Sequence, residues 1–362
     1  MKFLLVNIFL FLSLAGAGEL GSRLWTKNFG NPVDKTLAIL RPDPSLGWRG
    51  RPHLKEFFFG GGLETDGEGF RIPNESSSAQ KQLWTFGPSS AFGWGVENEG
   101  TYTQRAAKGL GWTARNLSQI GYSSAQGLSL VAQYPPPENS SVLFSYGIND
   151  LDRFRFFFPS FQSDAEFFAH PLSPGEIFVA NLGSHFHFLR YLLRGAGNIR
   201  AMVRCPLPPT LPLRVPIPST IENLEKFSAS LSAIHATLVV IDTPYLPARI
   251  QDGLASSEKI YRAAYEASVA GACGKSHALL EKFLALEPTR IHQDVNLLNA
   301  ALAQWAARSG TLIVKASHLL SEPADFVDPI HPSALGHEKI AAAITQLLQS
   351  RKSAKNVGKW KP

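Results

Sequence analysis

A serine and a histidine that lie far apart in the chain have the surroundings that a nucleophilic hydroxyl needs. Ser89 follows Gly87 and Pro88 at the end of an apolar run, and His331 has Asp328 three residues before it. A serine hydroxyl attacks a carbonyl only when a base removes its proton and another group orients that base. We therefore predict a nucleophile at Ser89, a base at His331 and an orienting carboxylate at Asp328.

Five short apolar segments predict the strands that bring these residues together. They are Gln82–Phe86, Thr113–Leu117, Val142–Tyr146, Ala236–Ile241 and Thr311–Lys315. Helical patterns lie at Thr101–Leu110, Pro174–Leu193, Thr220–Ser232, Ser257–Ala270, Val295–Arg308 and His337–Leu348. Short apolar strands that alternate with helices form a parallel sheet covered on both faces. The expected fold class is therefore α/β, with a central parallel five-stranded sheet.

Four short blocks follow strands of this expected sheet. They are Gly87-Pro-Ser-Ser90, Gly121-Tyr-Ser-Ser124, Gly147-Ile-Asn-Asp150 and Asp328-Pro-Ile-His331. Open α/β sheets place their sites outside the carboxyl ends of the strands. The four blocks are therefore expected to converge at one edge of the sheet.

In order and in neighbouring residues, these blocks resemble those of the SGNH (GDSL-type) hydrolases, particularly bacterial exported or membrane-anchored members. Ser89, Gly121, Asn149 and His331 match the four letters of the family name. The resemblance covers residues 80–150 and 310–348 well and residues 40–75 loosely, whereas 155–310 show no recognisable motif. It implies a three-layer α/β/α fold, SGNH or flavodoxin-like, and hydrolysis of an O-acyl ester by Ser89, Asp328 and His331.

The resemblance also implies which groups stabilise the oxyanion of the reaction. They are the backbone N–H groups of Ser89 and Gly121 and the side-chain amide of Asn149. No cofactor and no metal ion are expected. Asp325 is a less favoured substitute for Asp328, Asp150 is expected to be structural, and His337 is expected to lie at the surface or to cap a helix.

One residue departs from the family pattern, which has Asp where this chain has Pro88. Proline removes one backbone donor and fixes its own φ near roughly −65°. The N–H of Ser89 remains. Two interpretations stay open: a rigid turn with activity kept or reduced, or a displaced turn in a weakened, glycan-binding relative. A polysaccharide O-acetyltransferase on the same site is a further alternative.

The N-terminus predicts export. Lys2 precedes an apolar run, and a small-residue pattern at Ala15-Gly16-Ala17 follows it. This arrangement is typical of a secretory signal peptide, here cleaved after Ala17. An uncleaved N-terminal anchor is the alternative. Either places the body in the periplasm, outside the cell or at the outer face of the membrane.

The expected organisation is a signal peptide at 1–17, an irregular extension at 18–78 that packs on the body, a hydrolase domain at 79–350 and a basic tail at 351–362. The net charge of +6 resides partly in that tail, and no nucleic-acid motif accompanies it.

The expected partner is an acyl-ester substrate, which is a glycan or a lipid. No nucleic acid is expected to bind, and membrane contact is expected only through the N-terminus. The only two cysteines, Cys205 and Cys273, are either a disulfide pair or separate thiols. The oligomeric state stays open.

Overall fold

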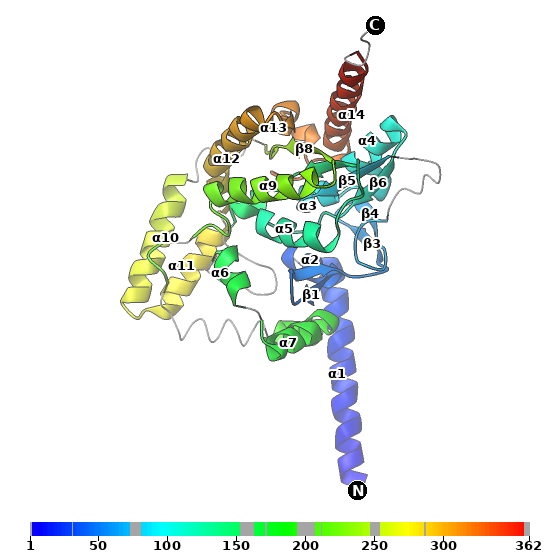
Figure 1. Ribbon diagram of the computed structural model, residues 1–362. Coiled ribbons are helices and arrows are strands. Elements are labelled where there is room, and N and C mark those ends of the chain that lie inside the picture. Colours follow the sequence, from blue (N-terminus) through cyan, green and yellow to red (C-terminus); the bar gives the residue numbers. More distant parts are fainter. Residues whose placement is uncertain are drawn as a thin grey trace.

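A computed structural model describes residues 2–30, 32–72, 81–152, 163–170, 172–193, 207–210, 212–246, 254–285 and 287–357. At its centre lies a sheet of five parallel strands in the order β6-β5-β7-β8-β9 (Figure 1). The strands are β5 (Gln82–Phe86), β6 (Thr113–Asn116), β7 (Ser141–Phe144), β8 (Thr237–Ile241) and β9 (Leu312–Val314). All five predicted strands are confirmed, with every boundary within two residues of its expected place.

Helices cover both faces of this sheet. One face packs against α4 (Tyr102–Leu110) and α14 (Ala334–Val357); the other lies beneath α5 (Ser124–Gln133), α9 (Ile217–Ser232) and α12 (Glu287–Ser309). Neighbouring side chains of a strand point to opposite faces of the sheet. On β8, Val239 packs in the core between the sheet and helices α4 and α14, whereas Val240 packs in the core between the sheet and helices α5, α9 and α12. The predicted three-layer α/β/α fold is confirmed.

Of the other helices, α10 (Leu254–Val269) confirms the one expected at Ser257–Ala270, and α7 (Pro174–His185) begins where the helix expected at Pro174–Leu193 begins; the rest were not predicted. These are α3 (Ser89–Phe92), η1 (Asn98–Gly100), η2 (Ile148–Asp150), α6 (Asp164–Ala169), a helix over 187–193, α11 (Cys273–Ala285), α13 (Ala316–Leu319) and η4 (Pro323–Asp325). The expected helix Pro174–Leu193 is interrupted at Phe186. Cys273 is disulfide-bonded, and Cys205, the only other cysteine, lies outside the described residues.

The segment before the sheet is more regular than the sequence predicted. Helix α1 (Lys2–Phe29) runs without a break through the expected cleavage site, and α2 (Pro32–Ile39) follows it. Two antiparallel hairpins come next, β1 (Leu40–Asp43) with β2 (Gly47–Gly50), and β3 (Lys55–Phe58) with β4 (Gly61–Glu64). Among the described residues, α1 is the one helix long and apolar enough to cross a membrane, over Leu5–Phe29, and a signal sequence meets the same criteria.

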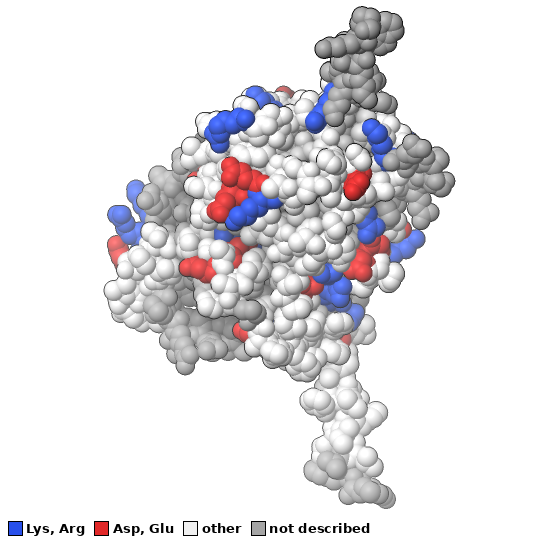
Figure 2. Space-filling model, viewed as in Figure 1, with Lys and Arg blue, Asp and Glu red and all other residues white. Residues whose placement is uncertain are grey.

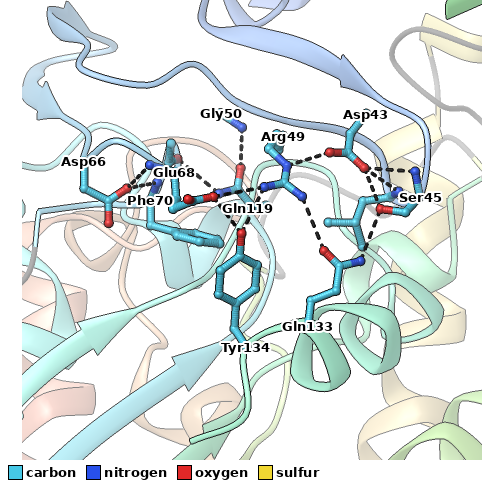
Figure 3. Close-up of polar contacts among 12 residues, drawn as sticks. Asp43, Ser45, Arg49, Gly50, Asp66, Glu68, Phe70, Gln119, Gln133 and Tyr134 are labelled. Carbon is cyan, nitrogen blue, oxygen red and sulfur yellow. Dashed lines mark hydrogen bonds and ion pairs between the residues drawn. The ribbon is translucent and has the colours of Figure 1, made fainter.

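A network of polar contacts attaches the first hairpin to the body (Figure 3). The Arg49 guanidinium pairs with Asp43 at 2.7 Å and donates to the Tyr134 hydroxyl at 3.1 Å. Beside it, the Gln119 side chain accepts from Gly50 N at 2.8 Å and donates to Gly69 O at 3.2 Å. Tyr134 and Gln119 belong to the body, so the hairpin is fixed close to the Gly121 block.

Candidate active site

Ser89 begins α3, directly after the tight turn that follows β5. Pro88 precedes the helix with φ −87° and ψ −159°, an extended conformation that the proline ring allows. A Cβ added at Gly87 would lie 2.6 Å from the Ala91 Cβ, so only glycine fits there without a shift. Ser89 is the first residue of α3, and the first N–H groups of a helix have no partner within it. Pro88 is therefore accommodated without displacing the serine backbone from the helix start.

His331 lies between the serine and the carboxylate that the sequence singles out. Its Nε2 is 2.7 Å from Ser89 Oγ, and its Nδ1 is 2.6 Å from Asp328 Oδ2. The other carboxylate oxygen of Asp328 accepts the backbone N–H groups of Ile330 and His331 at 3.0 and 2.9 Å. Burial raises the pKa of Asp328, but hydrogen bonding and the charge of His331 outweigh it, so the pKa is lowered. Asp328 is therefore held as an ionised acceptor.

Asp325, the substitute carboxylate, faces elsewhere. Its side chain is buried and pairs with Lys339 at 2.7 Å. It also accepts the N–H groups of Ser321 and Glu322, each at 3.2 Å. These contacts hold the segment that leads to His331, and Asp328 alone of the two carboxylates contacts the imidazole.

An aromatic stack that the sequence did not reveal covers the imidazole. The Trp94 ring lies parallel to the His331 ring, with 4.7 Å between centroids and 9° between planes. Phe59, from the turn between β3 and β4, stacks on the other side of Trp94 at 4.4 Å. Buried Arg71 donates to the carbonyl groups of Gly93 and Val96 at 2.6 and 2.9 Å. The extension before the sheet thus holds the loop that orients the histidine ring.

Gly121 and Asn149 lie in the loops after β6 and β7. Gly121 has φ +76°, a conformation that glycine adopts without strain. The Asn149 side-chain amide donates to Tyr122 O at 3.1 Å, which fixes its orientation beside the Gly121 loop. An amide nitrogen carries two protons, so one remains for another acceptor. The structure brings these two residues to the same edge of the sheet as Ser89 and His331; their role at an oxyanion stays a prediction.

A buried ion pair from the motif-free middle of the chain supports the Gly121 loop. Arg214 and Asp164 are 2% and 0% exposed at their side chains and form two contacts of 3.1 Å. The same guanidinium donates to Gly121 O and to Gln126 Oε1, both at 2.8 Å. Asp164 also accepts the Ser123 hydroxyl at 2.5 Å. No motif in the sequence indicated these residues, because each contact joins positions at least 41 residues apart.

Asp150 was expected to be structural, and its contacts are those of a fully buried acceptor. Its carboxylate receives the N–H and hydroxyl of Ser124 at 2.7 and 2.6 Å and the Thr220 hydroxyl at 2.7 Å. Burial raises the pKa of Asp150 to about 6, and the hydrogen bonds from Ser124 and Thr220 oppose that rise. The carboxylate joins the loop after β7 to the start of α5 and to α9.

This raised pKa predicts how stability depends on pH. The folded protein binds the Asp150 proton up to about pH 6 and the unfolded chain only up to its ordinary value of 3.8. The folded state therefore holds more protons between those values, and the free energy of unfolding falls as pH rises through them. At 1.36 kcal/mol per pKa unit, the loss is about 3 kcal/mol. Denaturant unfolding of the wild type and of Asp150→Asn at several pH values should give curves that diverge in this window; parallel curves would contradict the assignment.

The oxyanion role predicted for Asn149 can be tested directly. Removing one such donor typically lowers the rate by about 10²–10³, so Asn149→Ala should lower kcat by that factor and change KM little. Asn149→Asp keeps the shape of the side chain but replaces the amide donors with a negative charge, so its kcat should be lower still. Steady-state kinetics of the two variants on one ester decide the point; an Asn149→Asp enzyme as active as the wild type would exclude the role.

Of the two places expected for His337, the surface is wrong, and its contacts are those of a helix cap. It is fully buried, and its Nδ1 accepts the N–H of Tyr102, the first residue of α4, at 3.1 Å. Burial first, and the nearby charges of Arg71 and Arg105 second, lower the pKa of His337 to about 3. A neutral ring therefore caps α4. Among the described residues, no group of three or more His, Cys, Asp or Glu side chains could hold a metal ion.

Comparison with known proteins gives similarity at the level of structure alone. No family model and no curated protein matches the sequence. A member of the lipolytic protein G-D-S-L family from Veillonella parvula is similar in structure, at 10% identity and a TM-score of 0.39, over 74% of this chain and 98% of that chain. Similar too is a GDSL-like lipase from Bacteroides thetaiotaomicron, at 13% identity and a TM-score of 0.38, over 75% of this chain and 88% of that chain. An acetylxylan esterase from Geobacillus stearothermophilus is similar at 14% identity and a TM-score of 0.40, over 75% of this chain and 94% of that chain. Two of these names carry the family that the four blocks resemble, but TM-scores this low assign neither family nor activity to the chain.

Proposed function

We propose that this protein is an exported serine esterase of the SGNH type, which hydrolyses an O-acyl ester. The observation that carries the proposal is the continuous hydrogen-bonded chain from Ser89 Oγ through His331 to Asp328, at 2.7 and 2.6 Å. Nucleophile, base and orienting acid in contact are the signature of an activated serine. Asp328 and His331 lie in one segment, whereas Ser89 is 242 residues before His331, so the tertiary fold is what brings the serine to the histidine.

The reaction follows from these positions. Ser89 Oγ bonds to the ester carbonyl carbon while His331 Nε2 takes the hydroxyl proton, and the carbonyl electron pair moves onto its oxygen. The Ser89 and Gly121 N–H groups and the Asn149 amide stabilise that oxyanion. Collapse breaks the bond to the alcohol oxygen, which receives the proton from His331. Water then repeats the steps on the acyl-serine and releases the acid.

Pro88 is compatible with this proposal. The family carboxylate at this position is absent, yet Ser89 starts α3 and lies within hydrogen-bond distance of His331. These two observations favour a rigid turn over a displaced one. We therefore expect activity to be kept or reduced, and not lost.

The test is a panel of aryl esters with acetyl, butyryl and lauroyl groups, together with an O-acetylated polysaccharide, using the purified full chain. A fluorophosphonate probe, which reacts with activated serines whatever the natural substrate, serves as a second readout. We expect ester hydrolysis and covalent labelling, both absent from Ser89→Ala. A wild-type protein that neither hydrolyses nor labels would indicate a non-catalytic relative. Acetyl transfer to an added sugar in preference to water would identify a transferase.

A further inference from the structure

A set of exposed apolar side chains lies beside the point where α1 joins the body (Figure 1). We call this set the apolar collar. It consists of exposed residues of α7 and of the segment up to residue 193: Phe178, Val179, Phe186, Phe188, Leu192 and Leu193, between 39% and 62% exposed. Large apolar side chains that are exposed together in one short segment are typical of a site of contact with a partner or a membrane. Figure 2 shows this part of the molecule and the visible side of α1 as almost free of charged residues.

The collar is attached to α1 by specific contacts. The two carboxylate oxygens of Glu19 accept the N–H groups of His187 and Phe188 at 3.1 and 2.9 Å. Arg23 donates to His185 O at 2.9 Å and pairs with Glu19 at 2.7 Å. The Phe188 ring packs on α1 so closely that a Cβ at Gly18 would lie 3.1 Å from it. The collar and the second half of α1 therefore form one surface.

The length of α1 sets the depth at which this surface would meet a bilayer. Residues 2–18 precede the collar and extend about 25 Å as a helix, and α1 projects from the body while α7 lies across it (Figure 1). The hydrocarbon core of a bilayer is about 30 Å thick. If α1 fills that core, Gly18 and the Phe188 ring on it reach the boundary between acyl chains and headgroups.

The side chains just beyond Gly18 match that boundary. Trp25, 57% exposed, is of the type enriched at membrane interfaces. Exposed Arg23 and Lys27 suit anionic headgroups. Glu19, which lies deepest, is paired with Arg23 and with two backbone N–H groups. A charge so paired is tolerated away from water far better than an isolated one.

We propose that the apolar collar lies in the surface of a lipid bilayer that α1 enters, so that α1 is kept as an anchor and α7 rests in the headgroup–acyl boundary. The chemistry of the partner is that of a bilayer with anionic headgroups. The proposal does not depend on the esterase activity, because it uses none of the residues near Ser89.

The test places a polarity-sensitive fluorophore on single introduced cysteines of the full chain in vesicles of phosphatidylcholine and phosphatidylglycerol. The collar variants are Phe178→Cys and Leu192→Cys. The controls are Val269→Cys and Leu297→Cys, which replace side chains that are 70% and 63% exposed on α10 and α12. We expect phospholipids with brominated acyl chains to quench the collar probes several-fold more than the control probes, because bromine quenches only what reaches the acyl region.

Two results would overturn the proposal. Collar probes quenched no more than the controls would show that the collar faces water or another protein. Mass spectrometry of the protein recovered from the producing cells gives its first residue. A chain that begins at Gly18 would show that residues 1–17 are removed as a signal peptide. An intact N-terminus together with quenched collar probes supports it.

Discussion

Replacing Ser89 with alanine should lower kcat/KM for ester hydrolysis by on the order of 10⁶-fold, the loss seen when the serine of a catalytic triad is removed. The hydroxyl that lies 2.7 Å from His331 Nε2 is the atom that would bond to the carbonyl carbon, and alanine has no replacement for it. The substitution removes a single side-chain hydrogen bond, so the free energy of unfolding should change by about 1 kcal/mol or less. Activity and denaturant unfolding of the same preparation separate the two effects.

Ser90→Ala is the matched control for this experiment. Ser90 is the next residue of α3 and is similarly buried, 8% exposed against 5% for Ser89. It is the hydroxyl nearest in sequence that could be mistaken for the nucleophile. We expect Ser90→Ala to keep its activity within a few-fold of wild type and to react with the fluorophosphonate probe. If Ser90→Ala were the inactive variant and Ser89→Ala the active one, the assignment of the nucleophile would be wrong.

Replacing Arg214 with methionine should lower the free energy of unfolding by about 3–5 kcal/mol, the cost of removing one partner of a buried ion pair. Methionine keeps an unbranched, flexible side chain but is shorter and has no donors. It would leave the Asp164 carboxylate, which is 0% exposed, without its cation, and Gly121 O and Gln126 Oε1 without their 2.8 Å donors. Urea unfolding monitored by tryptophan fluorescence measures the loss.

Two controls separate this effect from a general effect of removing a cation. Lys226→Met breaks an exposed pair with Glu222, in which both side chains are 60% exposed, and such pairs contribute only about 0.3–0.5 kcal/mol. The double variant Arg214→Met, Asp164→Leu removes both charges, so no unpaired carboxylate remains. It should be more stable than Arg214→Met alone. A single variant that unfolds at the wild-type urea concentration would contradict the structural role of the pair.

Arg214 is also expected to position Gly121 for the reaction. Without Arg214, the Gly121 carbonyl loses this hydrogen-bond donor, and the adjoining peptide groups are no longer held in one orientation. We expect kcat to fall at temperatures where the variant is still folded, with KM less affected. This split would not follow from a residue that only stabilises the fold.

The parallel sheet and its helices follow from local properties of the sequence. Val142–Phe144 and Leu238–Ile241 are apolar over their whole length, and fully buried strands require this pattern. Helix α5 was missed, because a glycine and two serines obscure its apolar face, although its capping box at Ser123 and Gln126 is a signal that could have revealed it. The interruption at Phe186 was missed as well, since neither proline nor glycine marks it.

The sequence by itself determined the fold class and the residues that meet at the candidate site. Apolar periodicity is local, and the four blocks are short segments whose order can be followed along the chain. Only the tertiary structure decided how Pro88 is accommodated, that Trp94 stacks on His331, and that Arg214 and Asp164 support the Gly121 loop. Each of these contacts depends on packing between residues far apart in the chain or on a backbone conformation that such packing selects. The physical reason is that a long-range contact leaves no periodic pattern in the sequence around either partner.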